Sequence, residues 1–241
     1  MSTSPLAPPP PRPAARRRAG RPLLLLTGAA SLALGACQAE PPEAAGEGPA
    51  VSGGLVLVDD GAADPGFSAF RDALRETVAR RDTAALLAVV ADDARLSFGD
   101  EPGGPDGLRR MWLDGEAPDS AGVWGVLGHV LEGGSVEEDG AVTIPSVAAL
   151  WPNDLDPFAH VAVPSQDVPA FDAPGGRVVA RLSETVVPTS GPAADGWQPV
   201  LLPDGRAAVV EAAETMSPVG YRATFWDDGD GWRLRSFLAG D

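Results

Sequence analysis

Apolar side chains recur with helical spacing near residue 70. Phe67, Phe70, Leu74 and Val78 are separated by three, four and four positions. Because an α-helix has about 3.6 residues per turn, these four side chains share one face. Arginines and a glutamate occupy the opposite face, as is typical of a helix at a protein surface. The pattern predicts an amphipathic helix over residues 66–81.

Three further segments have patterns typical of short helices. They are residues 84–90, 107–113 and 120–131. Asp82 and Thr83 carry side-chain oxygens that can cap the first of them. Gly133 and Gly134 end the last one. That last helix offers a stripe of apolar side chains to a core, namely Val123, Val126, Leu127 and Val130.

The same part of the chain contains weaker patterns. Short strands are predicted over residues 55–58 and 95–98. Residues 141–158 hold three prolines, Trp151 and Phe158, and we expect an irregular connector that buries its aromatic side chains. Residues 55–158 are therefore interpreted as a helix-rich N-terminal domain.

After residue 158 the sequence changes to short runs of β-branched residues separated by Pro, Gly and Asp. The runs are residues 161–163, 178–182, 185–187, 200–202 and 207–210. Turn signals every 8 to 12 residues are typical of a small barrel. The sequence therefore predicts a β-barrel over residues 159–215.

The last residues predict a β-hairpin over residues 216–241. Tyr221, Ala223 and Phe225 alternate with polar residues, and a turn rich in aspartate and glycine follows at residues 227–231. Two arrangements stay open. The hairpin either stands beyond the barrel or pairs back onto the helix-rich domain, which would make the barrel an insertion.

Charge excludes a nucleic-acid partner. The segment before Cys37 carries five of the 18 basic residues and none of the 34 acidic ones, so the remainder has a net charge of −21. It contains no lysine and no basic stripe that could neutralise phosphates. The chain contains 29 glycines and 25 prolines, and these high counts favour turns over long helices.

The N-terminal residues have the pattern of a signal peptide. Five arginines lie within residues 12–21, and residues 23–36 are apolar or small. This apolar stretch is shorter than the roughly 20 residues that span a bilayer as a helix. We expect residues 1–36 to be removed.

The end of this segment resembles the bacterial lipobox. Leu34, Gly35 and Ala36 precede Cys37, which is the only cysteine in the chain. The resemblance implies acylation of Cys37, which then holds the protein to a membrane. Two or three buried acyl chains give stable anchoring without a transmembrane helix. The alternatives are ordinary secretory cleavage near Ala36 and a twin-arginine export route.

Two consequences follow from a lipidated Cys37. Residues 37–54 contain little apolar surface, and we expect a flexible tether there. Gln38 at the next position resembles the pattern for sorting to the outer membrane, if the host is Gram-negative. With its one thiol acylated, the chain has no disulfide and no cysteine nucleophile.

The β-rich part resembles the bacterial SH3-like domains. The resemblance covers residues 161–213 and follows the order Val168, Ala173-Pro174, 179–182, Val186-Val187, Gly196-Trp197, Val200 and Asp204-Gly205-Arg206. Such domains recognise peptides or peptidoglycan, which implies a ligand surface near Phe171, Trp197 and Arg206. The alternative for Trp197 is burial in the barrel core.

Other chemistry has simpler structural interpretations. His129 lies on a predicted helix beside core valines, and His160 follows Asp156 by four residues, as a loop cap would. Neither accompanies a serine elbow or a metal-ligand spacing. We therefore expect no catalytic residues, no metal and no cofactor.

Two loops also have structural rather than ligand-binding interpretations. Asp227, Asp228 and Asp230 lack the distant glutamate of a calcium loop, so they are interpreted as hairpin-turn residues. Gly103 and Gly104 precede a helix without the lysine of a phosphate loop. The six tryptophans, without basic neighbours, are expected to pack in cores and at edges.

Together these patterns predict an α+β protein with a helix-rich N-terminal domain, a small SH3-like β-barrel and a C-terminal hairpin. The expected protein is lipid-anchored, non-catalytic and located in the cell envelope, where it binds peptide or peptidoglycan. An accessory subunit of an envelope complex is the alternative, because an acidic body suits a basic protein partner. A hydrolase is the third possibility.

Overall fold

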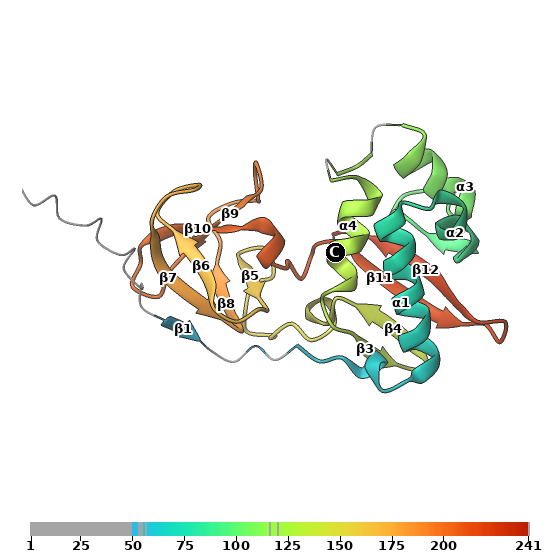
Figure 1. The fold of residues 1–241 in the computed structure, drawn as a ribbon, viewed down its shortest axis with the longest axis horizontal. Helices are drawn as coiled ribbons and strands as arrows, with labels where there is room; N and C mark the ends of the chain where they lie inside the picture. Colours follow the sequence, from blue (N-terminus) through green and yellow to red (C-terminus); the bar gives the residue numbers. More distant parts are fainter. Residues whose placement is uncertain (1–49, 53–54, 56, 116, 120, 241) are drawn as a thin grey trace, which may run out of the picture. The chain divides into compact units, whose positions relative to one another are not determined.

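The computed structural model describes residues 50–52, 55, 57–115, 117–119 and 121–240. The predicted signal peptide, Cys37 and the tether up to residue 49 lie outside the described residues. The described chain combines helices with two five-stranded sheets and one two-stranded sheet, so it is of mixed α+β class, as expected (Figure 1).

The helix–sheet region comprises residues 57–148 and 216–240. Its sheet has the strand order β2-β12-β11-β4-β3, in which β12 and β2 are parallel and the other neighbours are antiparallel. The strands are β2 (Val90–Arg95), β3 (Val136–Glu138), β4 (Ala141–Ile144), β11 (Arg222–Asp227) and β12 (Trp232–Leu238). The helices are η1 (Asp60–Ala62), α1 (Pro65–Arg80), α2 (Thr83–Ala88), α3 (Gly104–Leu108), η2 (Arg109–Leu113), α4 (Gly122–Leu131) and η3 (Ser146–Ala148).

Local sequence explains the long helices. The side chain of Asp64 accepts hydrogen bonds from the backbone N–H groups of Gly66 and Phe67, and Pro65 fits the first helical turn of α1. Asp82 caps α2 in the same way by accepting from Ala85. The predicted helices over residues 66–81 and 120–131 are therefore confirmed within one or two residues.

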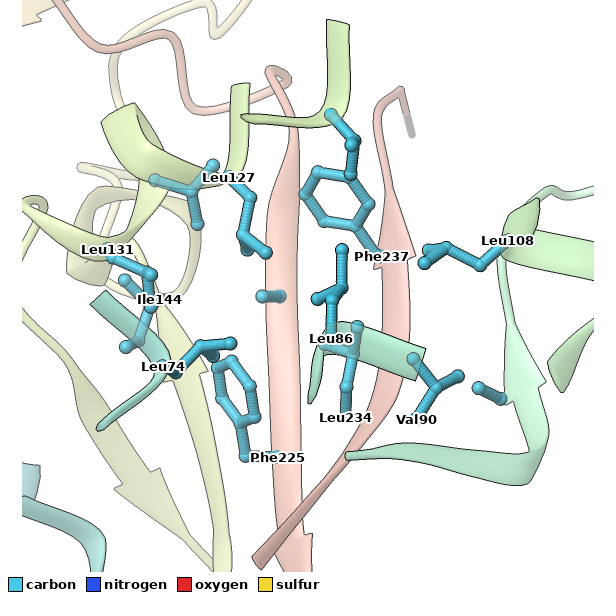
Figure 2. Close-up of a cluster of buried hydrophobic side chains, with 14 of the residues drawn as sticks. Leu74, Leu86, Val90, Leu108, Leu127, Leu131, Ile144, Phe225, Leu234 and Phe237 are labelled. Carbon is cyan, nitrogen blue, oxygen red and sulfur yellow. The ribbon is translucent and has the colours of Figure 1, made fainter. Parts of the chain in front are cut away.

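The core of this region lies between the helices and the sheet. Figure 2 shows Leu74 of α1 and Leu127 of α4 pointing toward the strands that carry Phe225 and Phe237. These side chains are almost fully buried. Each such side chain contributes about 1.5–3 kcal/mol through burial of apolar surface, so the helices are held mainly by packing.

The C-terminal hairpin belongs to this same sheet. Strand β11 pairs with β4, and β12 pairs with β2, so segments far apart in the sequence form neighbouring strands. Thr224 lies opposite Ser236, but Phe225 lies opposite Leu234, which leaves one extra residue on β12. This bulge shifts the alternation. As a result Phe237 is buried where simple alternation from Leu234 would have placed Ser236.

The β-rich segment comprises residues 159–215. It contains β5 (His160–Val163), β6 (Val168–Phe171), β7 (Val178–Ser183), β8 (Thr185–Pro188), β9 (Trp197–Leu201), β10 (Ala207–Glu211) and the short helix η4 (Ala212–Glu214). Strands β7, β6, β10 and β9 are neighbours in one sheet, and β5 pairs with β8 in another. Each of the five predicted runs overlaps an observed strand, although β9 begins three residues earlier than predicted, and β6 is an addition.

One apolar core serves both sheets of the β-rich segment. It consists of valine, alanine and leucine side chains, among them Val163, Leu182 and Val210. A single β-bridge joins Thr189 after β8 to Val200 of β9. The described strands of this segment do not form a closed barrel.

Three predictions near the N-terminus and in the first loops are wrong. The predicted tether ends in strand β1 (Ala50–Ser52), which pairs in parallel with β7. Leu57 and Val58, placed in a strand by their apolar run, are not in a strand, because backbone bonds to residues 184 and 135 hold this segment as a connection. The strand predicted over residues 95–98 lies instead at Val90–Arg95, because parallel pairing with β12 buries Val90 and Ala94.

The predicted connector over residues 141–158 is also wrong in part. Residues 141–144 form β4, whose alternating burial comes from pairing with β11 on one side and β3 on the other. Trp151 is half-buried and donates a hydrogen bond from Nε1 to the carbonyl of Leu155. Phe158 is 64% exposed. The turn residues around it hold it at the surface, where no core is available.

A polar network fastens the start of the helix–sheet region. Arg71 is only 6% exposed, and its guanidinium makes two hydrogen bonds to the carboxylate of Asp59 at 2.6 and 3.0 Å. The hydroxyl of buried Ser135 donates to the same carboxylate and accepts from the N–H of Gly61. Charged hydrogen bonds of this kind are strong. They connect residues 59–61 to both α1 and the entry to β3.

Candidate binding surface

The outward side of the larger sheet in the β-rich segment carries apolar side chains. Successive residues of a strand face opposite sides. In β9 and β10 the buried residues Gln198, Val200, Ala208 and Val210 face inward, so their neighbours face away from the core. We call the resulting patch the aromatic face, and it consists of Phe171, Trp197, Pro199, Leu201 and Val209.

Strand register explains why these residues meet. Val209 of β10 lies opposite Phe171 of β6 on one side and opposite Pro199 of β9 on the other. Trp197 is two residues before Pro199 and therefore lies on the same side of β9. Leu201, two residues after it, is 36% exposed. The face thus runs across three adjacent strands.

Phe171 and Trp197 form the centre of this face. Their ring centroids are 5.5 Å apart and their planes meet at 87°, which is an edge-to-face pair. Such a pair contributes about 0.5–1.5 kcal/mol beyond its buried area. Both rings are only partly buried. Trp197 therefore does not belong to the buried core, and part of each ring is open to a ligand.

Arg206, the third predicted binding residue, is engaged elsewhere. It lies in the exposed turn between β9 and β10, where its guanidinium pairs with Asp204 at 2.7 Å and reaches the carbonyl of Val179 at 3.4 Å. The backbone N–H and the guanidinium of Arg206 lower the pKa of the Asp204 carboxyl. The structure thus brings Phe171 and Trp197 together and gives Arg206 a role in ordering the turn.

Acidic side chains border the aromatic face. Glu211 lies opposite Trp197 in the pairing of β10 with β9 and is exposed. Asp172 directly follows Phe171 and is exposed as well, with Arg177 at 3.9 Å. The face therefore suits a ligand that is neutral or basic where it meets Trp197.

The other three members of the face could not be selected from the sequence. Leu201 and Val209 lie within predicted strands and Pro199 lies just before one, but only their cross-strand neighbours put them beside the aromatic rings. The alternation within residues 197–201 was the available signal, because Gln198 and Val200 occupy the inward positions.

The two histidines have structural partners. Nε2 of His129 lies 2.9 Å from the carbonyl oxygen of Thr215, and the ring is partly buried. Nδ1 of His160 lies 3.0 Å from the carbonyl oxygen of Asp156, four residues earlier. Both contacts are to backbone oxygens, which agrees with the interpretation of His160 as a loop cap.

The remaining sequence candidates also have local roles. Asp227 accepts hydrogen bonds from the N–H groups of Gly229 and Gly231, as turn chemistry requires. A Cβ on Gly103 would lie 2.0 Å from the carbonyl oxygen of Ala94, so this glycine allows α3 to approach β2. No cluster of side chains suited to a metal ion occurs within the described part of the chain.

The fold and this surface define a protein of α+β class with an exposed apolar sheet face. Comparisons of the chain with protein-family models, with curated proteins and with solved structures found no match. Within the described ranges, none of the helices has the length and apolar character needed to cross a membrane.

Proposed function

We propose that this protein is a lipid-anchored component of the bacterial cell envelope, and that its β-rich segment is an SH3-like module that binds peptide or peptidoglycan without catalysis. The aromatic face carries the binding part of this proposal. Partly exposed aromatic rings on a rigid sheet provide contact area at low entropic cost, and such residues dominate many binding surfaces.

The anchor part rests on the sequence that ends at Cys37. Acyl chains on its sulfur and on its freed amine would retain the protein at a membrane. In a Gram-negative host, Gln38 favours the outer membrane, with the folded part in the periplasm. The high negative charge of the chain after Cys37 makes direct adhesion to anionic lipid unfavourable, so retention would depend on the lipid.

Metabolic labelling tests the anchor. Radiolabelled palmitate should be incorporated into the wild-type protein, and Cys37→Ser should abolish both the label and the retention in the membrane fraction. An unlabelled wild-type protein, or a Cys37→Ser protein that stays equally bound to membranes, would show that the anchor is not a lipid on this residue.

Co-sedimentation with isolated peptidoglycan tests the binding module. The acyl-free protein, residues 38–241, should sediment with the wall material at low and at high salt, because apolar and stacking contacts are little screened by salt. Phe171→Ala and Trp197→Ala should each weaken binding about tenfold. Trp226→Ala is the matched control, because Trp226 is 46% exposed but lies in the helix–sheet region.

The outcomes separate the candidate functions. Equal loss of binding in all three variants, or no loss in any, would contradict a role of the aromatic face. No sedimentation at either salt concentration, together with enrichment of one basic protein at low salt, would favour an accessory subunit of an envelope complex. That second candidate is favoured by the net charge of −21 after Cys37. A hydrolase would require an activity that is lost on replacing His160.

A further inference from the structure

A cavity of about 450 Å³ lies outside the aromatic face, where α4 meets the segment that leads from η4 to β11. Ala121, Gly125 and His129 follow one another at intervals of four residues and so line one side of the helix. The two small residues leave room for a ligand. Met216 and Tyr221 form part of the opposite wall.

Hydrogen bonds from two neighbouring elements fix the wall of the cavity that contains Thr215 and Met216. The carbonyl oxygen of Thr215 is bonded by Nε2 of His129 at 2.9 Å. Met216 exchanges two backbone hydrogen bonds with Ala162 of β5, each 2.9 Å long. Because both neighbours fix this segment, the cavity exists before a ligand enters, which lowers the entropic cost of binding.

The contact to Thr215 also makes Nε2 of His129 a hydrogen-bond donor. A carbonyl oxygen can only accept a hydrogen bond, so Nε2 carries the hydrogen. In the neutral ring the other nitrogen, Nδ1, is then a hydrogen-bond acceptor. The acceptor nitrogen of neutral His129 is therefore the one that does not contact Thr215.

The cavity lining is mostly apolar but negative in charge. Asp119 is the one charged residue in the described lining, which includes no arginine. Its side chain accepts the N–H of Ala121 at 2.8 Å, which orders the turn before α4. Asp119 and Tyr221 both line the cavity, and burial, together with the negative charge of Asp119, raises the pKa of the Tyr221 hydroxyl.

Tyr221 is fixed from behind by aromatic packing. Its ring centroid lies 5.1 Å from that of Trp112 and 5.2 Å from that of Phe237. A fixed ring beside a carboxylate is an arrangement that attracts organic cations, since both the ring face and the carboxylate are electron-rich. Pockets of this size with few polar groups are typical of small-molecule sites.

We infer that this cavity binds a small organic cation, with an apolar body in the hollow beside Gly125 and an ammonium group directed to Asp119 and Tyr221. The ammonium group, as a donor only, fits the carboxylate oxygens that Asp119 provides. An anionic ligand would be repelled by Asp119, and a neutral ligand would leave the negative charge of Asp119 without an oppositely charged partner. This site is separate from the aromatic face and does not depend on the proposed wall binding.

Methionine methyl groups give a direct test. The chain has three methionines, Met1, Met111 and Met216, and of the two that the structure describes, Met111 and Met216, only Met216 lines the cavity. The full chain with Cys37→Ser and ¹³C-labelled methionine methyl groups is titrated by NMR with phenethylamine, phenethyl alcohol and phenylacetate. The amine should shift the Met216 signal and leave Met111 in place. Affinity should fall in the order amine, alcohol, carboxylate.

Two variants locate the charge and the cavity. Asp119→Asn keeps the acceptor for Ala121 but removes the charge, so it should lower amine affinity about fivefold and leave alcohol affinity unchanged. Asp114→Asn, an exposed residue outside the lining, is the matched control. Ala213→Phe adds a large ring at an exposed lining position and should prevent binding of both compounds.

Four results would overturn the inference, and the first three concern the ligands and Asp119. They are equal affinities for amine and alcohol, an Asp119→Asn variant with undiminished preference for the amine, and a Met216 signal that moves with none of the compounds. A shift of Met216 that persists at the same affinity in Ala213→Phe would place binding outside the cavity and contradict it equally.

Discussion

The helix–sheet region and the β-rich segment use their aromatic side chains in opposite ways. In the helix–sheet region Phe67, Phe225 and Phe237 are fully buried and contact further aromatic rings. In the β-rich segment the buried apolar side chains are those of valine, leucine and alanine, and Phe171 and Trp197 lie on the outward side of the sheet. The same residue types therefore stabilise one region and provide a surface on the other.

Core size explains part of this difference. Helices packed over a five-stranded sheet leave space that large rings fill, whereas the space between the two sheets of the β-rich segment is filled by β-branched and small side chains. An aromatic ring on a small sheet stays partly exposed unless another element covers it. That exposure is what makes the aromatic face a candidate binding surface, whereas the buried rings of Phe67, Phe225 and Phe237 contribute to stability.

The largest expected effect is in the core of the helix–sheet region. Phe225→Ala should lower the free energy of unfolding by about 4 kcal/mol, because it removes a fully buried ring and leaves a cavity. Val200→Ala in the core of the β-rich segment should cost about 2 kcal/mol. Urea unfolding measured by circular dichroism checks both values. Equal losses would remove the contrast between the two cores.

The polar network at the start of α1 should give the next largest effect. Asp59→Ala leaves the guanidinium of Arg71 buried without its carboxylate and should cost about 2 kcal/mol, since Asp59 itself is partly exposed. Asp72→Ala removes an exposed partner of Arg75 and should cost under about 0.5 kcal/mol. If Asp59→Ala and Asp72→Ala proved equally mild, the network would not stabilise the fold.

The same network predicts a dependence on pH. Burial opposes ionisation of Asp59, but hydrogen bonds from Arg71 and Ser135 and the charge of Arg71 outweigh it, so the pKa of Asp59 lies below its ordinary value of 3.8. The stabilisation is therefore fully present above that value and is lost as the pH falls through the lower pKa of the folded state. Acid unfolding of wild type and Asp59→Ala should converge at low pH. A constant difference across the range would contradict this account.

The smallest effect on stability is expected for the aromatic face. Phe171→Ala should lower the free energy of unfolding by about 1 kcal/mol or less, because the ring is only partly buried and loses mainly its contact with Trp197. Thermal unfolding measures this value, and Phe67→Ala, with a fully buried ring, is the contrasting variant. A loss comparable to that of Phe67→Ala would mean that Phe171 is a structural residue.

Short-range features of the fold could be predicted from the sequence. The apolar stripe from Phe67 to Val78, the capping residue Asp82 and the β-branched runs of the β-rich segment each depend on residues a few positions apart. Hydrogen bonds and steric preferences between such neighbours determine helices, turns and strands locally. The mixed α+β class follows from these elements alone.

Pairing between distant segments was decided only by the tertiary structure. The hairpin of β11 and β12 adds to β4 and β2, the bulge in β12 turns Phe237 inward, and Phe171 meets Trp197 across β10. Every strand edge offers similar backbone groups, so local sequence does not distinguish one partner from another. The choice is made by the shared burial of side chains from the whole chain. That is why the candidate residues were visible in the sequence, while the surface they form was visible only in the fold.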